Sequence, residues 1–246
     1  MIAQGAMASR VYVDAPLAPG ASLMLSGEAL AHLRALRVKK GERLTVFNGE
    51  KEFFARVLRL GKDETEVILE QQKAALPLPS LSMILALAIV AQDRMDWAIQ
   101  KATELGVRRI LPLATQRSQT LPQERVGPRL EHWQKVAISA SRQCGRATLA
   151  EVLPPVPFSS WIEDGREEEI QTKILLHPYG SLPLGRVGAL ESVSIAVGPE
   201  GGFAEEEVEA AKASGVQVCA LGKALLRTET AVAASLAVLL AQAGDL

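Results

Sequence analysis

Residues 192–215 read SVSIAVGPEGGFAEEEVEAAKASG. The first six residues predict a β-strand, and the six that follow, Gly198–Phe203, include three glycines. Glycine lets the backbone approach a ligand closely and adopt dihedral angles that other residues avoid. The acidic run after Phe203 predicts a helix, because carboxylates in a first turn complement the helix dipole. A strand, a glycine-rich loop and a helix in this order are typical of an α/β fold.

The same alternation of strands and helices continues on both sides of this stretch. LSMILALAIV (81–90) is a continuous apolar run, as expected of a strand buried on both faces of a sheet. Further strands are predicted at 107–114, 172–178 and 216–222, and helices at 96–105, 129–145 and 228–243. The pattern indicates a mostly parallel sheet with helices on both faces.

Residues 10–72 have a different pattern, which predicts several short strands and one helix. SGEALAHLRALR (26–37) predicts that helix, with Ser26 as a possible N-cap. Its apolar side is expected to carry Leu30, Leu33 and Leu36. Short strands around a single helix predict a small β-barrel.

Two further signals organise the N-terminal part of the chain. Asn48-Gly49 lies between two strand patterns and predicts a β-hairpin, because both residues tolerate positive φ. KAALPLPS (73–80) holds two prolines and no periodic face, which indicates a linker. We therefore expect two domains, residues 1–74 and 75–246.

Composition excludes several classes of protein. The chain has 246 residues, of which 48% are hydrophobic and 22% are charged, and this argues against disordered and fibrous proteins. Cys144 and Cys219 do not make a disulfide framework and are expected to be free thiols in a reducing cytosol. The three histidines and two cysteines lack ligand spacing, so no metal is expected. The apolar run 81–91 is too short to span a membrane and the first ten residues do not read as a secretory signal, which predicts a cytoplasmic protein.

Charge is distributed unevenly along the chain. The net charge is +2 for residues 1–75, +5 for 76–150 and −8 for 151–246, which together give the overall −1. A polyanion such as RNA is therefore expected to meet the first 150 residues, although an uneven solvated surface would give the same count. The candidates for phosphate contact are Arg10, Arg34, Arg37, Lys39, Lys40, Arg142 and Arg146.

Three loops leave predicted strands of the second domain, at 175–180, 197–203 and 221–230. In open parallel α/β sheets, ligands bind beyond the carboxyl ends of the strands, so these loops are expected to form one site. The glycine loop lacks both the GxGxxG pattern and the Lys-Ser/Thr of a P-loop, which disfavours dinucleotides and ATP. A tight strand-to-helix turn without a ligand remains the alternative.

The last of these loops precedes the final helix and carries three polar residues in a row. Thr228 is a candidate cap for that helix, and Glu229 lies in its first turn. The functional alternative is that Arg227 and Glu229 face the glycine loop. Among the histidines, His177 follows a buried strand and is the best site candidate, whereas His32 and His132 are expected to be structural or surface residues.

Taken together, the motifs resemble a known family. IQKATELGV (99–107), HWQKVAISASRQCGR (132–146), LLHP (175–178), VGPEGGF (197–203), LGKALLRTETA (221–231) and the terminal GDL follow the order of the RsmE family. These are bacterial SPOUT methyltransferases that methylate N3 of one uridine in 16S ribosomal RNA. The resemblance covers nearly the whole chain, and GPEGG together with LLRTET is specific.

The resemblance implies a PUA-like RNA-binding β-barrel for residues 1–74 and a SPOUT domain with a deep trefoil knot for 75–246. It also implies a homodimer that uses S-adenosylmethionine and acts on 16S ribosomal RNA within the assembled small subunit. The residues expected to bind this cofactor are Leu176, His177, Gly198, Pro199, Glu200, Gly201, Gly202, Leu221, Gly222, Leu225, Leu226 and Thr228. We expect Arg227 to stabilise the uracil anion and Glu229 to be the weaker candidate for the general base.

Two other classes of function remain open. One is a SPOUT methyltransferase that acts on another RNA, such as tRNA, or on a ribose hydroxyl. The other is an RNA-binding assembly factor that has lost catalysis. An NAD-dependent dehydrogenase is disfavoured by the missing dinucleotide fingerprint.

Overall fold

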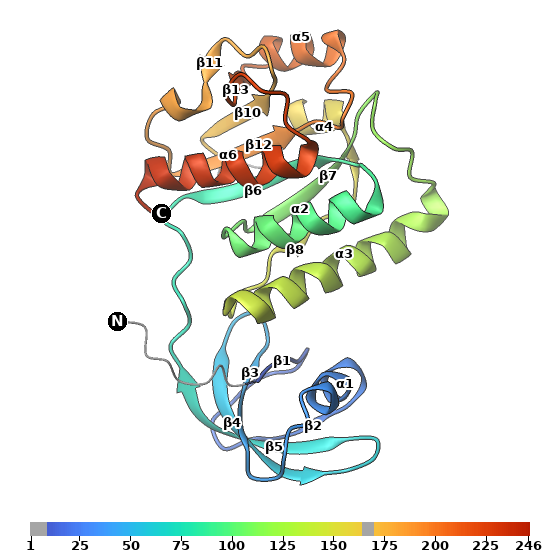
Figure 1. The fold of residues 1–246 in the computed structure, drawn as a ribbon, viewed down its shortest axis with the longest axis vertical. Coiled ribbons are helices and arrows are strands. Elements are labelled where there is room, and N and C mark those ends of the chain that lie inside the picture. Colours follow the sequence, from blue (N-terminus) through green and yellow to red (C-terminus); the bar gives the residue numbers. More distant parts are fainter. Residues whose placement is uncertain (1–8, 164–169) are drawn as a thin grey trace. The chain divides into compact units, whose positions relative to one another are not determined.

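The computed structural model describes residues 9–163 and 170–246 and divides them into two compact units (Figure 1). The first unit extends to Pro77 and includes Ser141–Leu149, and the second consists of Leu78–Ala140 and Ala150–Leu246. The sequence did not predict that Ser141–Leu149 would belong to the first unit. This arrangement places the end of a long helix and the loop after it against residues from the start of the chain.

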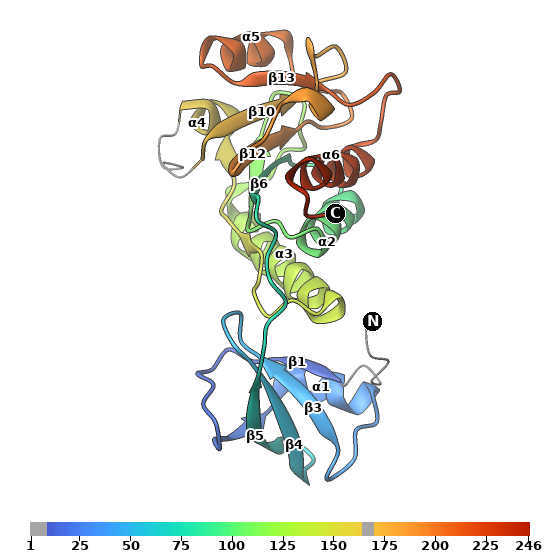
Figure 2. The same cartoon turned by 90° about the vertical axis from the view of Figure 1, so that its left-hand side faces the viewer.

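The first unit is a curled five-stranded sheet with one helix (Figure 2). Its elements are β1 (Arg10–Tyr12), β2 (Ser22–Leu25), α1 (Gly27–Ala35), β3 (Arg43–Phe47), β4 (Glu52–Leu60) and β5 (Thr65–Lys73). The strand order is β1-β3-β4-β5-β2, in which only β1 and β3 are parallel. The apolar residues of these strands form a separate core that includes Leu44, Val46, Phe53, Val57 and Val67.

Helix α1 forms where the sequence predicts it, with two differences. Leu30 and Leu33 are buried, but Leu36 is 46% exposed, so its placement on the buried face was wrong. The helix ends at Ala35, and beyond that residue the helical periodicity no longer sets the direction of a side chain. Ser26 occupies the N-cap position, yet its side chain makes no capping hydrogen bond within the described chain.

The Asn48-Gly49 hairpin is confirmed, but the two residues act in different ways. Phe47 and Glu52 are the last paired residues of β3 and β4, so the connection has four residues. Gly49 has a φ of 96°, whereas Asn48 acts through its side chain. Its Oδ1 accepts hydrogen bonds from the backbone N–H groups of Glu50 (3.1 Å) and Lys51 (2.9 Å). This Asx-type turn fixes the hairpin.

The second unit is a parallel sheet with helices on both faces, as the alternating pattern predicts. Its strands are β6 (Ser82–Ala88), β7 (Arg109–Ala114), β8 (Glu151–Val152), β9 (Val156–Pro157), β10 (Thr172–Leu176), β11 (Leu182–Pro183), β12 (Ser192–Val197) and β13 (Gln217–Ala220). Its helices are α2 (Gln92–Glu104), α3 (Gln123–Cys144), α4 (Phe158–Glu163), α5 (Glu205–Ala213) and α6 (Thr228–Ala243), with a 3₁₀ turn at Leu184–Arg186. The strand order is β11-β13-β10-β12-β6-β7-β8, and β9 pairs with β7.

The predicted helix boundaries agree with the structure for one helix and differ from it for two others. Helix α6 spans the predicted residues, whereas α2 and α3 begin earlier than predicted, at Gln92 and Gln123. Helix α3 continues through Gly127 and Pro128, which lie before its predicted start. The short elements β8, β9, β11 and α4 have too few residues for a periodic signal and were not predicted.

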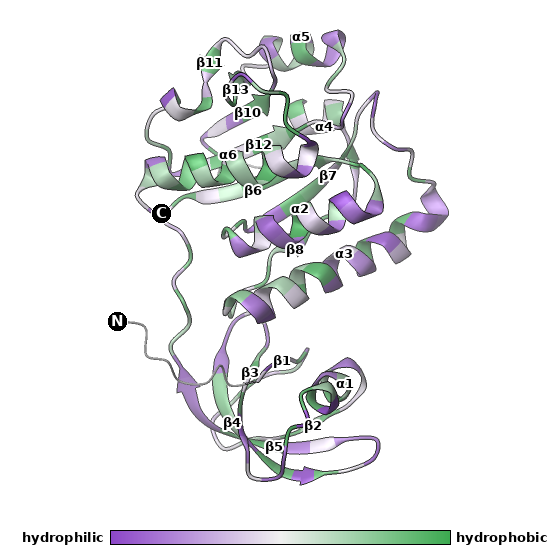
Figure 3. Cartoon of the chain, viewed as in Figure 1, coloured by the Kyte–Doolittle hydropathy of each residue, from purple (hydrophilic) through white to green (hydrophobic). Residues whose placement is uncertain are grey.

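Side chains of the central strands alternate between two cores. Leu85 and Leu87 of β6 belong to the core that includes residues of α2, α3 and α6, while Ala86 belongs to the core beneath α4 and α5. Successive side chains of a strand point to opposite faces, so one apolar run supplies both layers. Figure 3 shows β6 and α6 as largely hydrophobic, in contrast to the mixed surface of α3.

Both cysteines are free thiols, as expected, and Cys219 is buried in β13. Burial raises the pKa of the Cys219 thiol to about 11, which keeps it neutral. Among the described residues, no helix is both long enough and apolar enough to cross a membrane. The trefoil knot stays a prediction of the family resemblance.

Candidate functional site

Three strand-end loops meet at one edge of the parallel sheet. Strands β13, β10 and β12 are neighbours and run in the same direction, so their carboxyl ends lie together. The loops that follow them are residues 177–181, 198–204 and 221–227. The strand order therefore brings together three separate segments of residues 177–227, at the edge where the sequence predicts the site.

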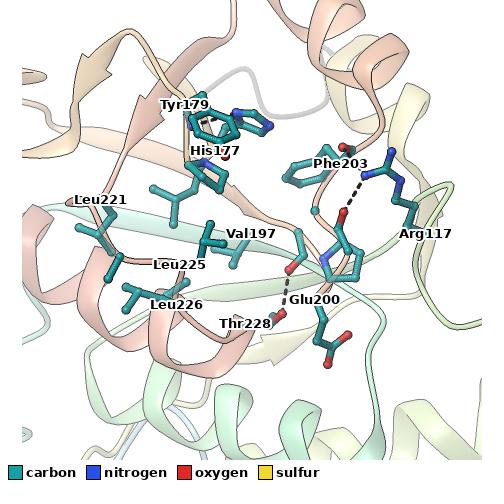
Figure 4. Close-up of a pocket in the computed structure, with 18 of the residues that line it drawn as sticks. Arg117, His177, Tyr179, Val197, Glu200, Phe203, Leu221, Leu225, Leu226 and Thr228 are labelled. Atoms are coloured by element: carbon teal, nitrogen blue, oxygen red, sulfur yellow. Dashed lines mark hydrogen bonds between the residues drawn. The ribbon is translucent and has the colours of Figure 1, made fainter.

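A pocket of about 370 Å³ opens between these loops (Figure 4). Every residue predicted to bind the cofactor lines it: Leu176, His177, Gly198, Pro199, Glu200, Gly201, Gly202, Leu221, Gly222, Leu225, Leu226 and Thr228. The lining residues outside this predicted set are Arg117, Pro178, Tyr179, Val197, Phe203, Ala224 and Ala231. Apolar side chains with a few polar groups are typical of a small-molecule site.

The glycine loop is shaped by its own backbone and by Phe203. The Gly202 N–H donates to the Pro199 carbonyl oxygen (2.8 Å), and Gly202 has a φ of 68°, which closes a tight turn. A Cβ atom on Gly198 would lie 3.1 Å from two carbons of the Phe203 ring. Phe203 is itself buried against Phe158. The loop therefore needs glycine at 198 for space and at 202 for conformation.

The loop after β10 is fixed by backbone hydrogen bonds. The His177 N–H donates to the Cys219 carbonyl oxygen (2.8 Å), and the Gly180 N–H donates to the His177 carbonyl oxygen (3.0 Å). A Cβ on Gly180 would lie 2.3 Å from the carbonyl carbon of Cys219, so this position also requires glycine. This requirement at Gly180 was not predicted, because its close neighbour Cys219 lies far away in the sequence.

His177 contributes both main chain and ring to this loop. Its Nδ1 lies 3.3 Å from the Tyr179 N–H, which fits an acceptor nitrogen in a neutral imidazole. Burial, and secondarily the positive charge of Lys212, lower the pKa of His177. The ring is therefore held in its neutral form, with Nδ1 free of a proton.

The third loop joins the pocket to helix α6. Thr228 is 3% exposed, and its Oγ1 donates a 3.0 Å hydrogen bond to the Gly198 carbonyl oxygen. The predicted capping role of Thr228 was wrong: the N-cap is Arg227, and Thr228 is the first helical residue. Leu225 is 76% exposed and Leu226 is 41% exposed, at the rim of the pocket.

Arg227 and Glu229 flank the pocket, and neither is among the described residues that line it. The Arg227 side chain is exposed, and Glu229 is half-buried. One carboxylate oxygen of Glu229, Oε2, is buried and has no hydrogen-bond partner within the described chain. Their predicted catalytic roles stay predictions.

Two charged residues outside the predicted set also contact the glycine loop. Arg94 of α2 forms an ion pair with Glu200. Arg117 donates from Nη1 to the carbonyl oxygens of Gly201 (2.7 Å) and Phe203 (3.4 Å). Neither arginine was predicted to contact this loop, and only the fold brings them to it.

The basic residues of the first unit separate into two groups. Arg10 pairs with the fully buried Glu52, and its Nη2 donates to the Arg146 carbonyl oxygen (2.8 Å). Desolvation lowers the pKa of Arg10, and Arg146 is only 7% exposed. The exposed candidates for phosphate contact are Arg34, Arg37, Lys39 and Lys40, while Arg142 is half-buried.

Within residues 9–163 and 170–246, no group of three or more His, Cys, Asp or Glu residues is placed to hold a metal ion. The two charged side chains that line the pocket, Arg117 and Glu200, are both engaged with protein atoms.

Comparison with known proteins identifies two family matches. Residues 77–240 match the RNA methyltransferase domain family, and residues 25–70 match the RNA methyltransferase PUA domain family. The chain is 31% identical to ribosomal RNA small subunit methyltransferase E of Buchnera aphidicola subsp. Schizaphis graminum, over 96% of this chain and 97% of that protein. It is 30% identical to the protein of the same name from Synechocystis sp., over 94% and 77% of the two chains.

Two solved structures show the same fold over nearly the whole chain. A methyltransferase of Legionella pneumophila in complex with the cofactor SAM superposes with a TM-score of 0.87 and 35% identity, over 95% of this chain and 97% of that one. A ribosomal RNA small subunit methyltransferase E from Neisseria gonorrhoeae bound to S-adenosyl methionine gives a TM-score of 0.87 and 34% identity, over 94% and 95%. The predicted fold class, a PUA-like sheet followed by a SPOUT-type α/β domain, is confirmed.

Proposed function

Since the chain belongs to the RsmE family of RNA methyltransferases, we propose that it transfers a methyl group from S-adenosylmethionine to 16S ribosomal RNA. The observation that carries this proposal is the pocket between the three strand-end loops, in a fold whose SAM-bound relatives superpose at a TM-score of 0.87. N3 of a single uridine is the proposed acceptor, within the assembled small subunit.

The pocket suits S-adenosylmethionine in size and chemistry. Its volume lies within the range of small-molecule sites, and Leu176, Val197, Leu221 and Leu226 offer apolar walls to an adenine ring. The glycine loop and the 177–180 loop supply backbone groups for polar contacts. S-adenosylmethionine supplies a methyl group on a positively charged sulfur, which leaves as a neutral thioether.

The protein has to align the methyl donor with uracil N3 and to help remove the N3 proton. Uracil N3 carries a proton and becomes a good nucleophile only when that proton leaves. Arg227 is proposed to stabilise the negative charge that develops on the uracil oxygens, and Glu229 is proposed as the weaker candidate for the base. Glu200 is the alternative, although its pairing with Arg94 favours a role in shaping the loop.

The acceptor base has to be unpaired, because N3 takes part in base pairing. This favours an RNA loop over a duplex. The exposed Arg34, Arg37 and Lys39 of the PUA-like unit are proposed to hold flanking phosphates. Half-buried Arg142 stays in the proposed RNA-binding set, whereas Arg10 and Arg146 are proposed to support the fold of that unit.

A homodimer is proposed, with a second copy against the rim of the pocket. Tyr179 is 85% exposed, and Leu225 and Leu226, which line the same pocket, are also exposed. Apolar side chains gathered at one place mark an interaction surface. We also propose a cytoplasmic location, because ribosomal RNA is the substrate, and a reaction without a metal.

The test is transfer of labelled methyl from S-adenosylmethionine to small ribosomal subunits that lack this modification. Naked 16S RNA and tRNA serve as parallel substrates, and the labelled nucleoside is identified by chromatography and mass spectrometry. Label at N3 of one uridine in the subunit would support the full proposal. Label in tRNA or on a ribose would indicate another SPOUT activity. Cofactor binding without transfer to any RNA would remove the substrate assignment.

Arg227→Ala separates a catalytic role from cofactor binding. If Arg227 stabilises the uracil anion, this variant should lose methyl transfer far more than affinity for S-adenosylmethionine, because loss of a charge that acts only in the transition state lowers kcat. Equal losses of transfer and affinity would place Arg227 among the cofactor contacts.

A further inference from the structure

Glu207 is a buried carboxylate whose two oxygens join different parts of the chain. It lies in the first turn of α5 and is 7% exposed. Its Oε2 accepts a hydrogen bond from the Ala204 N–H (2.8 Å), at the end of the glycine loop. Its Oε1 accepts one from the Gln116 N–H (2.9 Å), in the turn that follows β7. Both partners are donors, so the site requires two acceptor atoms.

The turn at residues 115–118 makes a second contact with the same loop. Arg117 Nη1 donates to the carbonyl oxygens of Gly201 and Phe203, and the Arg117 side chain packs beside Gly201. Figure 4 shows the Arg117 guanidinium directed at the loop. The turn at residues 115–118 therefore holds the glycine loop at two places. Arg117 contacts Gly201 in the middle of the loop, and Gln116 is linked through Glu207 to Ala204 at its end.

The turn itself is well anchored. Ser118 Oγ accepts from the Thr115 N–H (2.9 Å) and donates to the Thr115 carbonyl oxygen (3.0 Å). The Gln119 N–H donates to the Ile89 carbonyl oxygen at the end of β6 (2.8 Å). The turn is thus fixed to the sheet, and it can serve as a rigid support for the glycine loop.

These contacts close a ring. It runs from Glu207 to Gln116, along the chain to Arg117, across to Gly201 and Phe203, and back through Ala204 to Glu207. We infer that this ring is a positioning device for the cofactor pocket, with Arg117 and Glu207 as its positioning residues. The inference rests on the proposed function, because it assigns the ring a role in binding S-adenosylmethionine.

The two residues differ in a way that makes the inference testable. Arg117 lines the pocket, whereas Glu207 is not among its described lining residues and acts through Gln116 and Ala204. Glu207→Gln keeps the shape of the side chain but replaces one acceptor oxygen with a donor NH₂ group. One of the two backbone N–H groups would then face another donor, and the ring would open.

The experiment measures S-adenosylmethionine binding by calorimetry, together with KM and kcat, for wild type, Glu207→Gln, Arg117→Ala and the double variant. We expect Kd and the KM for the cofactor to rise about tenfold in each single variant, equivalent to ~1.4 kcal/mol. The kcat at saturating cofactor should change less than about twofold, because the ring does not touch the reacting atoms. The double variant should lose little more than the worse single variant, because either change opens the same ring.

Glu206→Gln is the matched control. It removes the same charge from the same turn of α5, but Glu206 is exposed, and its cofactor affinity should equal that of wild type. Thermal melting without cofactor checks that each variant is folded. Arg117 is exposed, so Arg117→Ala should stay folded even if Glu207→Gln does not.

The outcomes separate the inference from the proposed function. If wild type does not bind S-adenosylmethionine, the proposed function fails. If wild type binds and both single variants bind equally well, the ring has no positioning role and the inference fails. A loss in Arg117→Ala alone, with a folded Glu207→Gln unaffected, would also overturn it, because Arg117 would then act by touching the cofactor directly.

Discussion

The hydroxyl of Thr228 donates a 3.0 Å hydrogen bond to the carbonyl oxygen of Gly198, thirty residues earlier in the chain. This bond joins the first residue of α6 to the first residue of the glycine loop. Thr228 is 3% exposed, so no solvent molecule readily replaces the hydroxyl. The contact ties two walls of the pocket together.

Thr228→Val should therefore weaken both the fold and the pocket. Valine keeps the shape but leaves the Gly198 carbonyl oxygen without this donor, which should lower the free energy of unfolding by roughly 1–2 kcal/mol. Chemical denaturation and calorimetric binding of S-adenosylmethionine measure the two effects. Thr228→Ser retains the hydroxyl and serves as the control. Equal stability of the valine variant and wild type would show that the bond contributes nothing.

Gly198→Ala should also lower the free energy of unfolding, by about 1–3 kcal/mol, because the new methyl group meets the Phe203 ring at 3.1 Å. Phe203 is buried against Phe158 and has little room to move. The cofactor affinity should fall as the loop shifts. Denaturation curves and binding calorimetry give both quantities.

Gly127→Ala is the matched control for this change. Gly127 lies inside helix α3, and an added Cβ there has no described atom within 4 Å. Alanine should increase the free energy of unfolding by about 0.5–1 kcal/mol, since glycine is a poor helix former. The two glycine-to-alanine changes should thus have opposite signs. The same sign for both would contradict the steric argument at Gly198.

Arg10→Ala should lower the free energy of unfolding. Arg10→Ala leaves Glu52, which is fully buried, with Lys73 as its remaining ion-pair partner at 2.9 Å. Loss of one partner of a buried pair should cost ~3 kcal/mol of unfolding free energy. Urea denaturation measures this cost. A second variant, Arg10→Met with Glu52→Leu, should recover part of the loss, because it removes the buried charge as well.

Arg34→Ala should behave in the opposite way to Arg10→Ala. Its side chain is exposed, so stability should change by less than about 0.5 kcal/mol. If it contacts a phosphate, RNA affinity should fall and the slope of log K against log salt should decrease by roughly 0.7–0.9. Filter binding at several salt concentrations measures that slope. An unchanged slope would remove Arg34 from the proposed RNA surface.

The lowered pKa of His177 predicts a pH dependence. Burial, followed by the charge of Lys212, makes the folded protein bind this proton less readily than the unfolded chain does. The contribution of His177 to the free energy of unfolding should therefore be fully present above its ordinary pKa of 6.5. It should be lost as the pH falls from there toward the lowered pKa. His32, whose pKa is also lowered, contributes with the same sign.

His177→Asn should flatten this pH dependence, and His32→Asn should remove the rest of the histidine contribution. Denaturation of wild type and the two variants between pH 7.5 and pH 5 provides the comparison. Cofactor affinity should also fall in acid for wild type, because a protonated Nδ1 cannot accept from the Tyr179 N–H. A slope that His177→Asn leaves unchanged would assign the effect to other groups.

The sequence by itself determined the order of the longer helices and strands, the parallel α/β architecture, the hairpin at Asn48-Gly49 and the segments that line the pocket. These depend on local signals: apolar periodicity, glycine-rich loops at strand ends, and motifs whose spacing matches a family. The carboxyl ends of parallel neighbouring strands meet at one edge, so the three loops had to meet as well.

Only the tertiary structure decided which side chains face one another across that edge and inside the first unit. Arg10 and Glu52 are 42 positions apart, and Glu207 reaches Gln116 across 91. The sequence placed Arg10 among surface cations and placed Arg227 at the pocket, yet Arg117 is the arginine that lines it. No periodicity encodes such pairs. They depend on strand order, on the loop conformations and on which polar groups the fold removes from water.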